Sequence, residues 1–388
     1  MKFIPLYLLL LIFNSAGAQS YIASYGAVTS QVSQSNVLAS LTEFQGFGIK
    51  YRGTPAQANA LSWLEDKYLS YGFTSAQINE DPFSYSGSTC KNLVVTKTGT
   101  TYPDIFVIIG AHYDTVNGPG TNDNGSGTAV MLEIARLLVN VPTEYSIRFI
   151  HFAGEEDGLV GSNHYVNSVV NATNPKMNIR LMLNLDQVGG VAGGPNTSVT
   201  CERDQSNPTS NNAASNTMTQ QLMACVTNYS VLNPVMAAAY GSDYVPFENN
   251  GEIITGLYET NESSYPHTAN DLLVNMDPGY VFQIAKASVG AALHFAVACE
   301  TCNLDVAENF TDSQIALYPN PAKDYTVITI DLLDASCVLA DMTGKVVRRF
   351  ASIGLDGRLD LTGLAAGEYL VVVQSKDRSL TKKLLVVR

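Results

Sequence analysis

Histidine and carboxylate side chains follow several apolar, strand-like runs of this sequence. The runs are 105–109, 147–152, 179–185 and 253–258, and the residues after them are His112, Glu155 with Glu156, Asp186 and, beyond a loop, His267. A further carboxylate, Asp123, lies in the glycine-rich turn 120–127. In α/β sheets, ligands bind just beyond the carboxyl ends of the strands. Imidazole and carboxylate are the ligands of hydrolytic zinc, so these residues predict one metal-dependent hydrolytic site.

Each of these residues also has an ordinary explanation when it is taken alone. The turn 120–127 could simply cap the following helix, and Glu155-Glu156 could be a solvated acidic pair. A single histidine is more often structural than a metal ligand. Their joint occurrence after strands favours a site. The other three histidines fall inside predicted strands or helices and are expected to be structural: His151, His164 and His294.

The elements that must position these residues alternate along the chain. Apolar runs at 93–96, 105–109, 147–152, 179–185 and 253–258 are predicted strands, and 128–139 and 281–299 are predicted helices. Thr54-Pro55-Ala56-Gln57 is a capping box that begins another helix, which ends at Gly72. The stretch Gln205–Thr217 is predicted to be a loop. This alternation predicts an α/β fold with a mostly parallel sheet flanked by helices, over residues 37–300.

The composition changes after this region. Residues 301–314 form a polar linker, and residues 315–388 contain short alternating strands separated by turns with glycine or aspartate. The predicted strands are 327–332, 337–340, 345–350, 369–374 and 383–387. Such spacing is typical of a small all-β sandwich.

The N-terminus predicts export. Lys2 precedes an apolar run that is followed by Ala16-Gly17-Ala18, so residues 1–18 are predicted to be a signal peptide. Residues 19–36 are polar and predict an N-terminal extension or propeptide. No later run reaches the length of a transmembrane helix. The net charge of −13 argues against nucleic acid, because phosphate binding needs clustered lysine and arginine.

Disulfides are permitted in an exported protein, and the chain has six cysteines. Cys201 and Cys225 could form a loop-closing disulfide. Cys299 and Cys302 could pair with each other or with other cysteines, and the sequence leaves that pairing open.

Residues 37–300 resemble the M28 zinc peptidases, a family that includes secreted bacterial leucyl-type aminopeptidases. The matching segments, in the order of the family, are GAHYDT (110–115), PGTNDNGSG (119–127), FAGEEDGLVGS (152–162), LNLDQVGG (183–190), SDYVPFENNGE (242–252) and YPHTANDLL (265–273). The resemblance implies two zinc ions bridged by Asp123. His112 and Asp186 would complete the ligands of one ion, and Glu156 and His267 those of the other.

The resemblance also implies roles for residues beside the ligands. Glu155 would be the general base, and Asp114 would orient the imidazole of His112. Asp271 would act in a similar way near His267. Where some relatives place a tyrosine directly before the last histidine, this chain has Pro266. The oxyanion or substrate donor is therefore left open among three tyrosines: Tyr265, Tyr240 and Tyr244.

The implied activity is removal of N-terminal residues from peptides with a free N-terminus. A glutaminyl cyclase, which forms N-terminal pyroglutamate with one zinc on the same fold, is the alternative. The context 153–159, AGEEDGL, fits the peptidases better. An adhesion protein without metal is a third reading, but all five implied ligands are chemically competent.

The last 74 residues resemble a type IX secretion C-terminal sorting domain. The resemblance depends on LYPNPA (317–322), DMTGK (341–345), LAAGEY (364–369) and a basic, apolar end. It implies the type IX secretion machinery as a partner, and a secreted or cell-surface location. A carbohydrate-binding or adhesion sandwich is the alternative, and the absence of an aromatic-rich platform favours sorting.

Overall fold

The computed structural model describes residues 19–300, 315–330, 336–341, 346–350, 357–375 and 378–387. The predicted signal peptide 1–18 and linker 301–314 lie outside these ranges. The chain divides into two compact units, Met1–Val306 and Ala307–Arg388.

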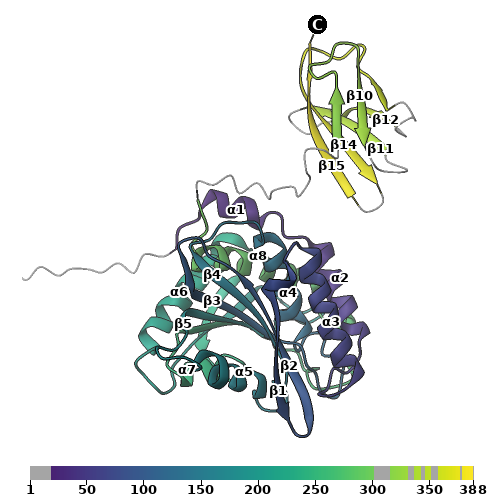
Figure 1. Ribbon diagram of the computed structural model, residues 1–388. Helices are drawn as coiled ribbons and strands as arrows, with labels where there is room; N and C mark the ends of the chain where they lie inside the picture. The colour runs from purple at the N-terminus through teal and green to yellow at the C-terminus, as the bar shows by residue number, and fades with distance from the viewer. Residues whose placement is uncertain are drawn as a thin grey trace, which may run out of the picture. The chain divides into compact units, whose positions relative to one another are not determined.

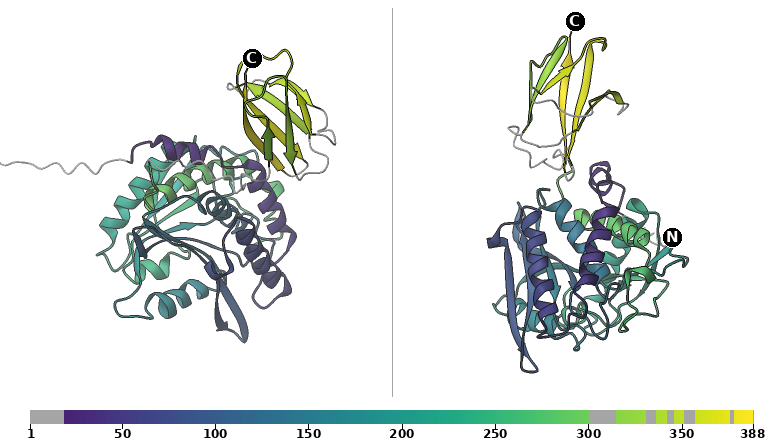
Figure 2. Two further views of the ribbon diagram at one scale, coloured as in Figure 1. Left: turned by 45° about the horizontal axis from the view of Figure 1, so that its top comes forward. Right: turned by 90° about the vertical axis from the view of Figure 1, so that its right-hand side faces the viewer.

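The first unit is built on an eight-stranded sheet with the order β1-β2-β4-β3-β5-β8-β6-β7 (Figure 1). Its strands are β1 (Ile78–Tyr85), β2 (Ser88–Lys97), β3 (Tyr102–His112), β4 (Tyr145–Phe152), β5 (Asn178–Leu185), β6 (Ser198–Arg203), β7 (Asn233–Ala238) and β8 (Ile254–Glu259). The four central strands β4, β3, β5 and β8 are mutually parallel. Figure 2 shows the antiparallel β1–β2 hairpin extending past the other strands. The parallel centre places four carboxyl ends at one edge.

Helices cover both faces of this sheet. One face packs against α1 (Ala23–Thr29), α2 (Gln34–Gly46), α3 (Pro55–Ser70), α4 (Gly125–Leu138), α6 (Asn212–Tyr229) and α8 (Pro278–Phe295). The other face packs against α5 (Val160–Tyr165) and α7 (Val245–Asn249). Neighbouring residues of one strand pack into the apolar cores on opposite faces of the sheet. Ile109 lies in the core on the side of α4 and Ile108 in the core on the side of α5, and both are fully buried. This accounts for the continuous apolar runs in the sequence.

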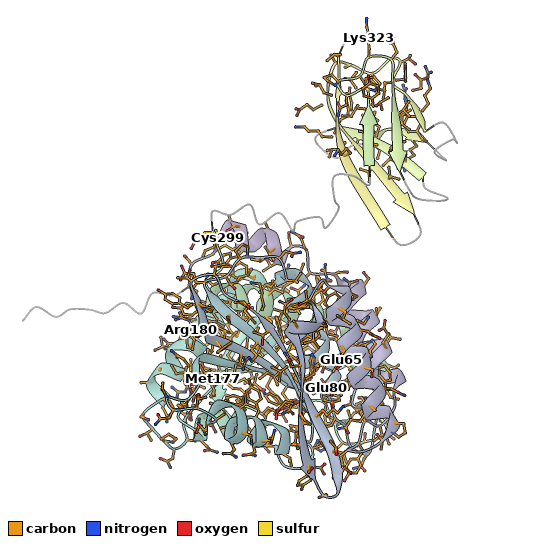
Figure 3. All side chains as sticks on the ribbon, viewed as in Figure 1. Glu65, Glu80, Met177, Arg180, Cys299 and Lys323 are labelled. Carbon is orange, nitrogen blue, oxygen red and sulfur yellow. The ribbon has the colours of Figure 1, made fainter. Side chains whose placement is uncertain are left out.

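The amino ends of the central strands lie at the opposite edge of the sheet. Figure 3 marks Met177 and Arg180 at the start of β5. The Nε of Arg180 donates a hydrogen bond to the carbonyl of Phe295 at 3.1 Å, which ties this edge to the end of α8. The polar residues singled out in the sequence belong to the other edge.

The segment 19–36, predicted to be an N-terminal extension or propeptide, contains a helix that packs on the core. Residues 23–29 form α1, and Tyr25 and Val28 are buried in the larger core. The hydroxyl of Tyr25 donates to the carbonyl of Ala298 at 2.5 Å, and the Tyr25 ring meets the edge of His294. The spacing of Tyr25, Val28 and Val32 is helical, and this apolar stripe outweighs the polar composition around it.

Replacing Tyr25 with alanine is expected to lower the free energy of unfolding by about 3–5 kcal/mol, because a large buried ring is lost and a cavity remains. Urea denaturation of the full chain measures this loss. Tyr240→Ala is the matched control: that side chain is 84% exposed, so its removal should change the free energy by less than about 0.5 kcal/mol. Equal effects of the two substitutions would contradict the integration of α1 into the core.

Two predictions need correction. The predicted loop Gln205–Thr217 is shorter, because α6 begins at Asn212. Cys201 and Cys225 do not form a disulfide: both are free, buried thiols, one on β6 and one on α6, that pack in the core. The pairing of Cys299 stays open, because Cys302 lies outside the described residues.

The second unit consists of two antiparallel sheets. One has the order β13-β10-β9 and the other β12-β11-β14-β15. Their strands are β9 (Ile315–Tyr318), β10 (Tyr325–Ile330), β11 (Ser336–Asp341), β12 (Val346–Phe350), β13 (Arg358–Asp360), β14 (Gly367–Ser375) and β15 (Arg378–Val386). An apolar cluster that includes Leu339, Val371 and Leu384 is buried within this unit. The predicted fold class, an α/β unit followed by a small all-β unit, is confirmed.

Among the described residues, no helix combines the length and the apolar character needed to cross a membrane.

Candidate active site

Most of the polar residues singled out in the sequence meet at the carboxyl edge of the parallel strands. His112 is the last residue of β3, Asp186 directly follows β5, and Glu155 and Glu156 follow β4 after a short turn. His267 lies in the loop that follows β8. Asp123 lies just before α4, whose N-cap Asn124 accepts a hydrogen bond from Gly127 N. Residues that follow separate strands thus form one cluster.

The cluster forms two trios that share Asp123. One trio is His112, Asp123 and Asp186, and the other is Asp123, Glu156 and His267; within each, the ligand atoms lie within 4.8 Å of one another. The Nε2 of His112 lies 3.1 Å from Asp123 Oδ1 and 3.5 Å from Asp186 Oδ1. The Nε2 of His267 lies 3.0 Å from Asp123 Oδ2 and 3.0 Å from Glu156 Oε2. The two oxygens of Asp123 therefore face different trios.

The first trio contains atoms that the protein itself leaves without a partner. His112 Nε2 and Asp186 Oδ1 are buried and make no hydrogen bond among the described residues. A buried polar atom without a partner is costly, and native structures rarely keep one without a reason. Imidazole and carboxylate donors converging on one point form a donor set that suits a divalent transition metal such as zinc. The residues present therefore fit zinc.

Without a bound metal, the carboxyl groups and imidazoles of the cluster shift one another's pKa values. Burial alone would raise the pKa of Asp123, but contact with the two histidines lowers it to about 2. Burial, and then the nearby Asp123, raise the pKa of Glu156 to about 8. Contact with Asp123 raises the pKa of His267 to about 9. Near neutral pH, Glu156 and His267 therefore retain protons that a bound cation would displace, whereas Asp123 is already ionised.

Glu155 lies beside the first trio without belonging to either. Its Oε2 is 3.9 Å from His112 Nε2, and its side chain is 14% exposed. Burial raises its pKa well above the usual range; His112 opposes the shift, and the carboxylates of Asp186 and Asp243 add to it. A carboxylate in this position is suited to exchange protons with water or substrate.

The structure places Asp114 differently from the sequence-based expectation. Its carboxylate oxygen is 3.7 Å from His112 Nδ1, whereas its backbone carbonyl lies at 3.1 Å from the same nitrogen. The carboxylate instead accepts hydrogen bonds from the backbone N–H groups of Glu155 and Glu156 at 3.2 and 3.3 Å. The carboxylate of Asp114 thus holds the turn that carries both glutamates.

Asp271 holds the turn before α4. It is 1% exposed and accepts hydrogen bonds from the backbone N–H groups of Asn122 (2.7 Å) and Asp123 (3.0 Å). Asn122 in turn donates its side-chain amide to both carboxylate oxygens of Glu259, at 3.0 and 3.1 Å. This network fixes the turn that carries the shared carboxylate.

Several residues beside the trios were missed in the sequence. Ser242 Oγ donates to Asp186 Oδ2 at 2.5 Å. Gln187 Nε2 donates to Asp123 Oδ2 at 3.1 Å, and the Tyr258 hydroxyl lies 3.4 Å from Gln187 Oε1. Asp243 is fully buried, and burial raises its pKa to about 7. The segment 242–252 resembles a family motif, which was the available indication for Ser242 and Asp243.

The three candidate tyrosines have different surroundings. Tyr244 is 1% exposed and its hydroxyl donates to Glu202 Oε1 at 2.9 Å. Its proton is therefore not free to bind a substrate oxygen. Tyr240 is 84% exposed. Tyr265 is partly buried in the loop of His267, two residues before it. Of the three, Tyr265 lies nearest in sequence to a trio residue.

The remaining histidines pair with other partners. His151 Nε2 lies 3.0 Å from the Tyr68 hydroxyl, and burial lowers the pKa of this histidine to about 3. His164 Nε2 lies 3.1 Å from Asp81 Oδ1, and His294 Nε2 lies 2.8 Å from the Tyr229 hydroxyl. None of these three belongs to the trios formed by the described residues.

Comparison with known proteins gives relatives of both units. The family model described as Secretion system C-terminal sorting domain matches residues 316–387. Aminopeptidase YwaD of Bacillus subtilis is 45% identical over 109 residues, which are 27% of this chain and 23% of the relative. An aminopeptidase of Pseudomonas aeruginosa is 45% identical over 132 residues (34% and 23%). The alignment thus spans about a quarter of the length of each of these relatives.

Proteins that align with a longer part of this chain have a lower sequence identity to it. A probable leucine aminopeptidase of Trichophyton verrucosum is 27% identical over 282 residues, 67% of this chain and 70% of the relative. The LapA aminopeptidase of Legionella pneumophila has a TM-score of 0.62 at 19% identity, over 76% of this chain and 80% of LapA. A glutaminyl cyclase of Bacteroides thetaiotaomicron has a TM-score of 0.55 at 16% identity, over 67% and 97%. At these identities, the two structures show a shared fold.

A match within the first unit identifies the family of the chain. The model described as Peptidase family M28 matches residues 92–292, a range of 201 residues in a chain of 388. That range contains the residues of both trios. The resemblance noted in the sequence is confirmed, and the chain belongs to peptidase family M28.

Proposed function

We propose that this protein is a secreted aminopeptidase that uses two zinc ions to hydrolyse the N-terminal residues of peptides. The observation that carries the proposal is the pair of trios that share Asp123, with unpartnered atoms on His112 and Asp186. Family membership and the relatives named aminopeptidases support the same activity.

The ligands divide between the two ions. Asp123 would be shared by both ions, His112 and Asp186 would hold one, and Glu156 and His267 would hold the other. When bound, zinc ions supply Lewis-acid chemistry, which polarises a peptide carbonyl and lowers the pKa of water. The side chain of His267 is 55% exposed whereas that of His112 is 1% exposed, so substrate would approach from the side of the second trio.

Glu155 acts as the general base in this proposal. Its carboxylate takes a proton from the attacking water and returns it to the amine that leaves when the peptide bond breaks. Asp114 is a positioning residue, because its carboxylate holds the backbone of Glu155 and Glu156. Carboxylates beside the ions would recognise the free α-amine, and Tyr265 remains the candidate donor to the carbonyl oxygen in the transition state.

Removal of metal is expected to abolish the proposed activity. The measurement is release of nitroaniline from a broad panel of aminoacyl-nitroanilides, before and after dialysis against a chelator, with zinc added back. We expect turnover to fall to background and to recover with about two zinc ions per chain. No chelator-sensitive release from any substrate of the panel would overturn the proposal.

Glutaminyl cyclase activity is the alternative on this fold. The cyclase structure shares the fold at 16% identity. A glutaminyl cyclase would use one zinc ion, whereas two trios that share a carboxylate favour two ions. The same purified protein separates the two readings: an N-terminal glutaminyl peptide would be cyclised by a cyclase and shortened by an aminopeptidase.

Export is the proposed route for this enzyme. The match of residues 316–387 to a secretion sorting domain implies recognition by the type IX secretion machinery. Deletion of residues 315–388 is expected to leave the peptidase inside the cell, as detected by fractionation. Full secretion of the shortened chain would contradict a sorting role for this unit.

A further inference from the structure

A second group of oxygen atoms gathers outside the two trios, where the segment after β6 meets α7. Its carboxylates are Asp204, directly after β6, and Glu248 in α7, which are 1% and 5% exposed. The backbone N–H and the hydroxyl of Ser206 donate to Asp204 Oδ1 at 2.7 and 2.9 Å. The carboxyl group of Glu248 lies within hydrogen-bonding reach of Asp204 and Ser206. Two buried acidic groups are therefore direct neighbours.

Four oxygens of this group have no hydrogen-bond partner among the described residues. They are Asp204 Oδ2, Glu248 Oε2, Asn211 Oδ1 and Asn212 Oδ1, and all four atoms are buried. The amide nitrogen of Asn211 donates to the Glu248 carbonyl at 3.2 Å, and that of Asn212 donates to the Ser206 carbonyl at 3.1 Å. Asn211 also donates to the Glu252 carbonyl, at 2.7 Å. Asn211 is thus bonded to the backbone of Glu248, and Asn212 to the backbone of Ser206, the residue that donates to Asp204. Acceptors without donors are rare in folded proteins.

No basic side chain compensates the charge of this group within the described residues. Within the described part of the chain, no lysine or arginine forms an ion pair with Asp204 or Glu248. The neighbouring Lys176 pairs instead with Glu252 Oε1, at 2.5 Å, and donates to the Asn250 carbonyl at 2.8 Å. Burial, and then the adjacent Asp204, raise the pKa of Glu248 to about 7. Buried charges are normally paired or bound to a metal.

We infer that Asp204, Glu248, Asn211 and Asn212 form a calcium site, separate from the catalytic zinc ligands. All the available donors are oxygens, which calcium prefers in sets of about six to eight at roughly 2.3–2.6 Å. Histidine and cysteine, the donors that favour zinc, are absent from the set. Two carboxylates match the charge of one divalent ion, and water would complete the coordination.

The location gives this ion a structural role. It would join the segment between β6 and α6 to α7. Ser242, three residues before α7, donates to Asp186 Oδ2. A calcium ion would therefore brace the segment that contacts one of the zinc ligands. The inference does not depend on the hydrolytic activity.

Calcium binding is tested with the zinc-saturated full chain, dialysed into calcium-free buffer. Calcium chloride at about 10 mM is expected to raise the Tm by about 5 °C, if the dissociation constant lies near 10⁻⁴ M. Calorimetric titration should show one saturable calcium site per chain. Magnesium chloride at the same concentration should produce a much smaller shift, since magnesium demands stricter geometry.

Asp204→Asn and Glu248→Gln should each remove most of the calcium-dependent shift. In calcium-free buffer, both variants should be at least as stable as the original protein, because each replaces one of two adjacent buried acidic groups with a neutral amide. Glu252→Gln is the matched control: it removes a carboxylate from the same region but not one of the proposed ligands, so its calcium response should persist. Two results would each overturn the inference: no saturable calcium binding by the original protein, or an unchanged calcium response in both ligand variants.

Discussion

Glu155→Gln is expected to lower kcat by about 10³-fold while leaving the zinc content at two ions per chain. The amide has nearly the shape of the carboxylate but cannot accept a proton from water. Because Glu155 belongs to neither trio, its replacement removes no proposed ligand. Steady-state kinetics on the best nitroanilide substrate, together with metal analysis of the same sample, measure both quantities.

Asp157→Asn is the matched control for this experiment. Asp157 lies two residues further along the same turn, pairs with Arg52 and belongs to neither trio. Its loss should change kcat by no more than a few-fold. A Glu155→Gln enzyme with an undiminished rate would exclude Glu155 as the base. Loss of zinc from that variant would instead make Glu155 a ligand.

Asp123→Asn is expected to have the larger effect on metal binding. This one residue offers an oxygen to each trio, 3.1 Å from His112 Nε2 and 3.0 Å from His267 Nε2. An amide supplies a single neutral oxygen, so both sites lose a charge and one loses a ligand atom. We expect the zinc content to fall from two ions to one or fewer per chain, and hydrolysis to fall to background.

Metal analysis after dialysis against buffer with trace zinc checks this prediction. Glu80→Gln is the control, because Glu80 is a half-exposed carboxylate paired with Lys91 on the β1–β2 hairpin. It should retain two zinc ions. Two tightly bound zinc ions in Asp123→Asn would contradict the bridging role.

The placement of the proposed ligands was predictable from the sequence for a physical reason. Parallel strands bring their carboxyl ends to one edge, so residues as distant as His112 and His267 meet once the strands are identified. The supporting contacts were not predictable in the same way. The Asp114 carboxylate binds the backbone of Glu155 and Glu156, and only the path of that turn determines this.

Local composition is a poor guide to structure where long-range packing decides it. The segment that contains α1 is polar on average, yet Tyr25 and Val28 bury against elements about 270 residues away. A loop-closing disulfide between Cys201 and Cys225 was compatible with the sequence, but both are free thiols on a strand and a helix inside the core. Asp243 lacked any periodic or spacing signal of its own, because its importance depends on which carboxylates surround it.

The contact of α1 with the end of the same unit also has a kinetic consequence. The Tyr25 hydroxyl binds the carbonyl of Ala298, and the Ile22 N–H donates to the Tyr229 hydroxyl. The larger core therefore closes only when both ends of the segment 19–300 are present. Contacts of such sequence separation slow folding. During synthesis, the nascent chain must emerge almost to residue 300 before it can complete this core, so folding should be a late event, after most of the chain is available for translocation.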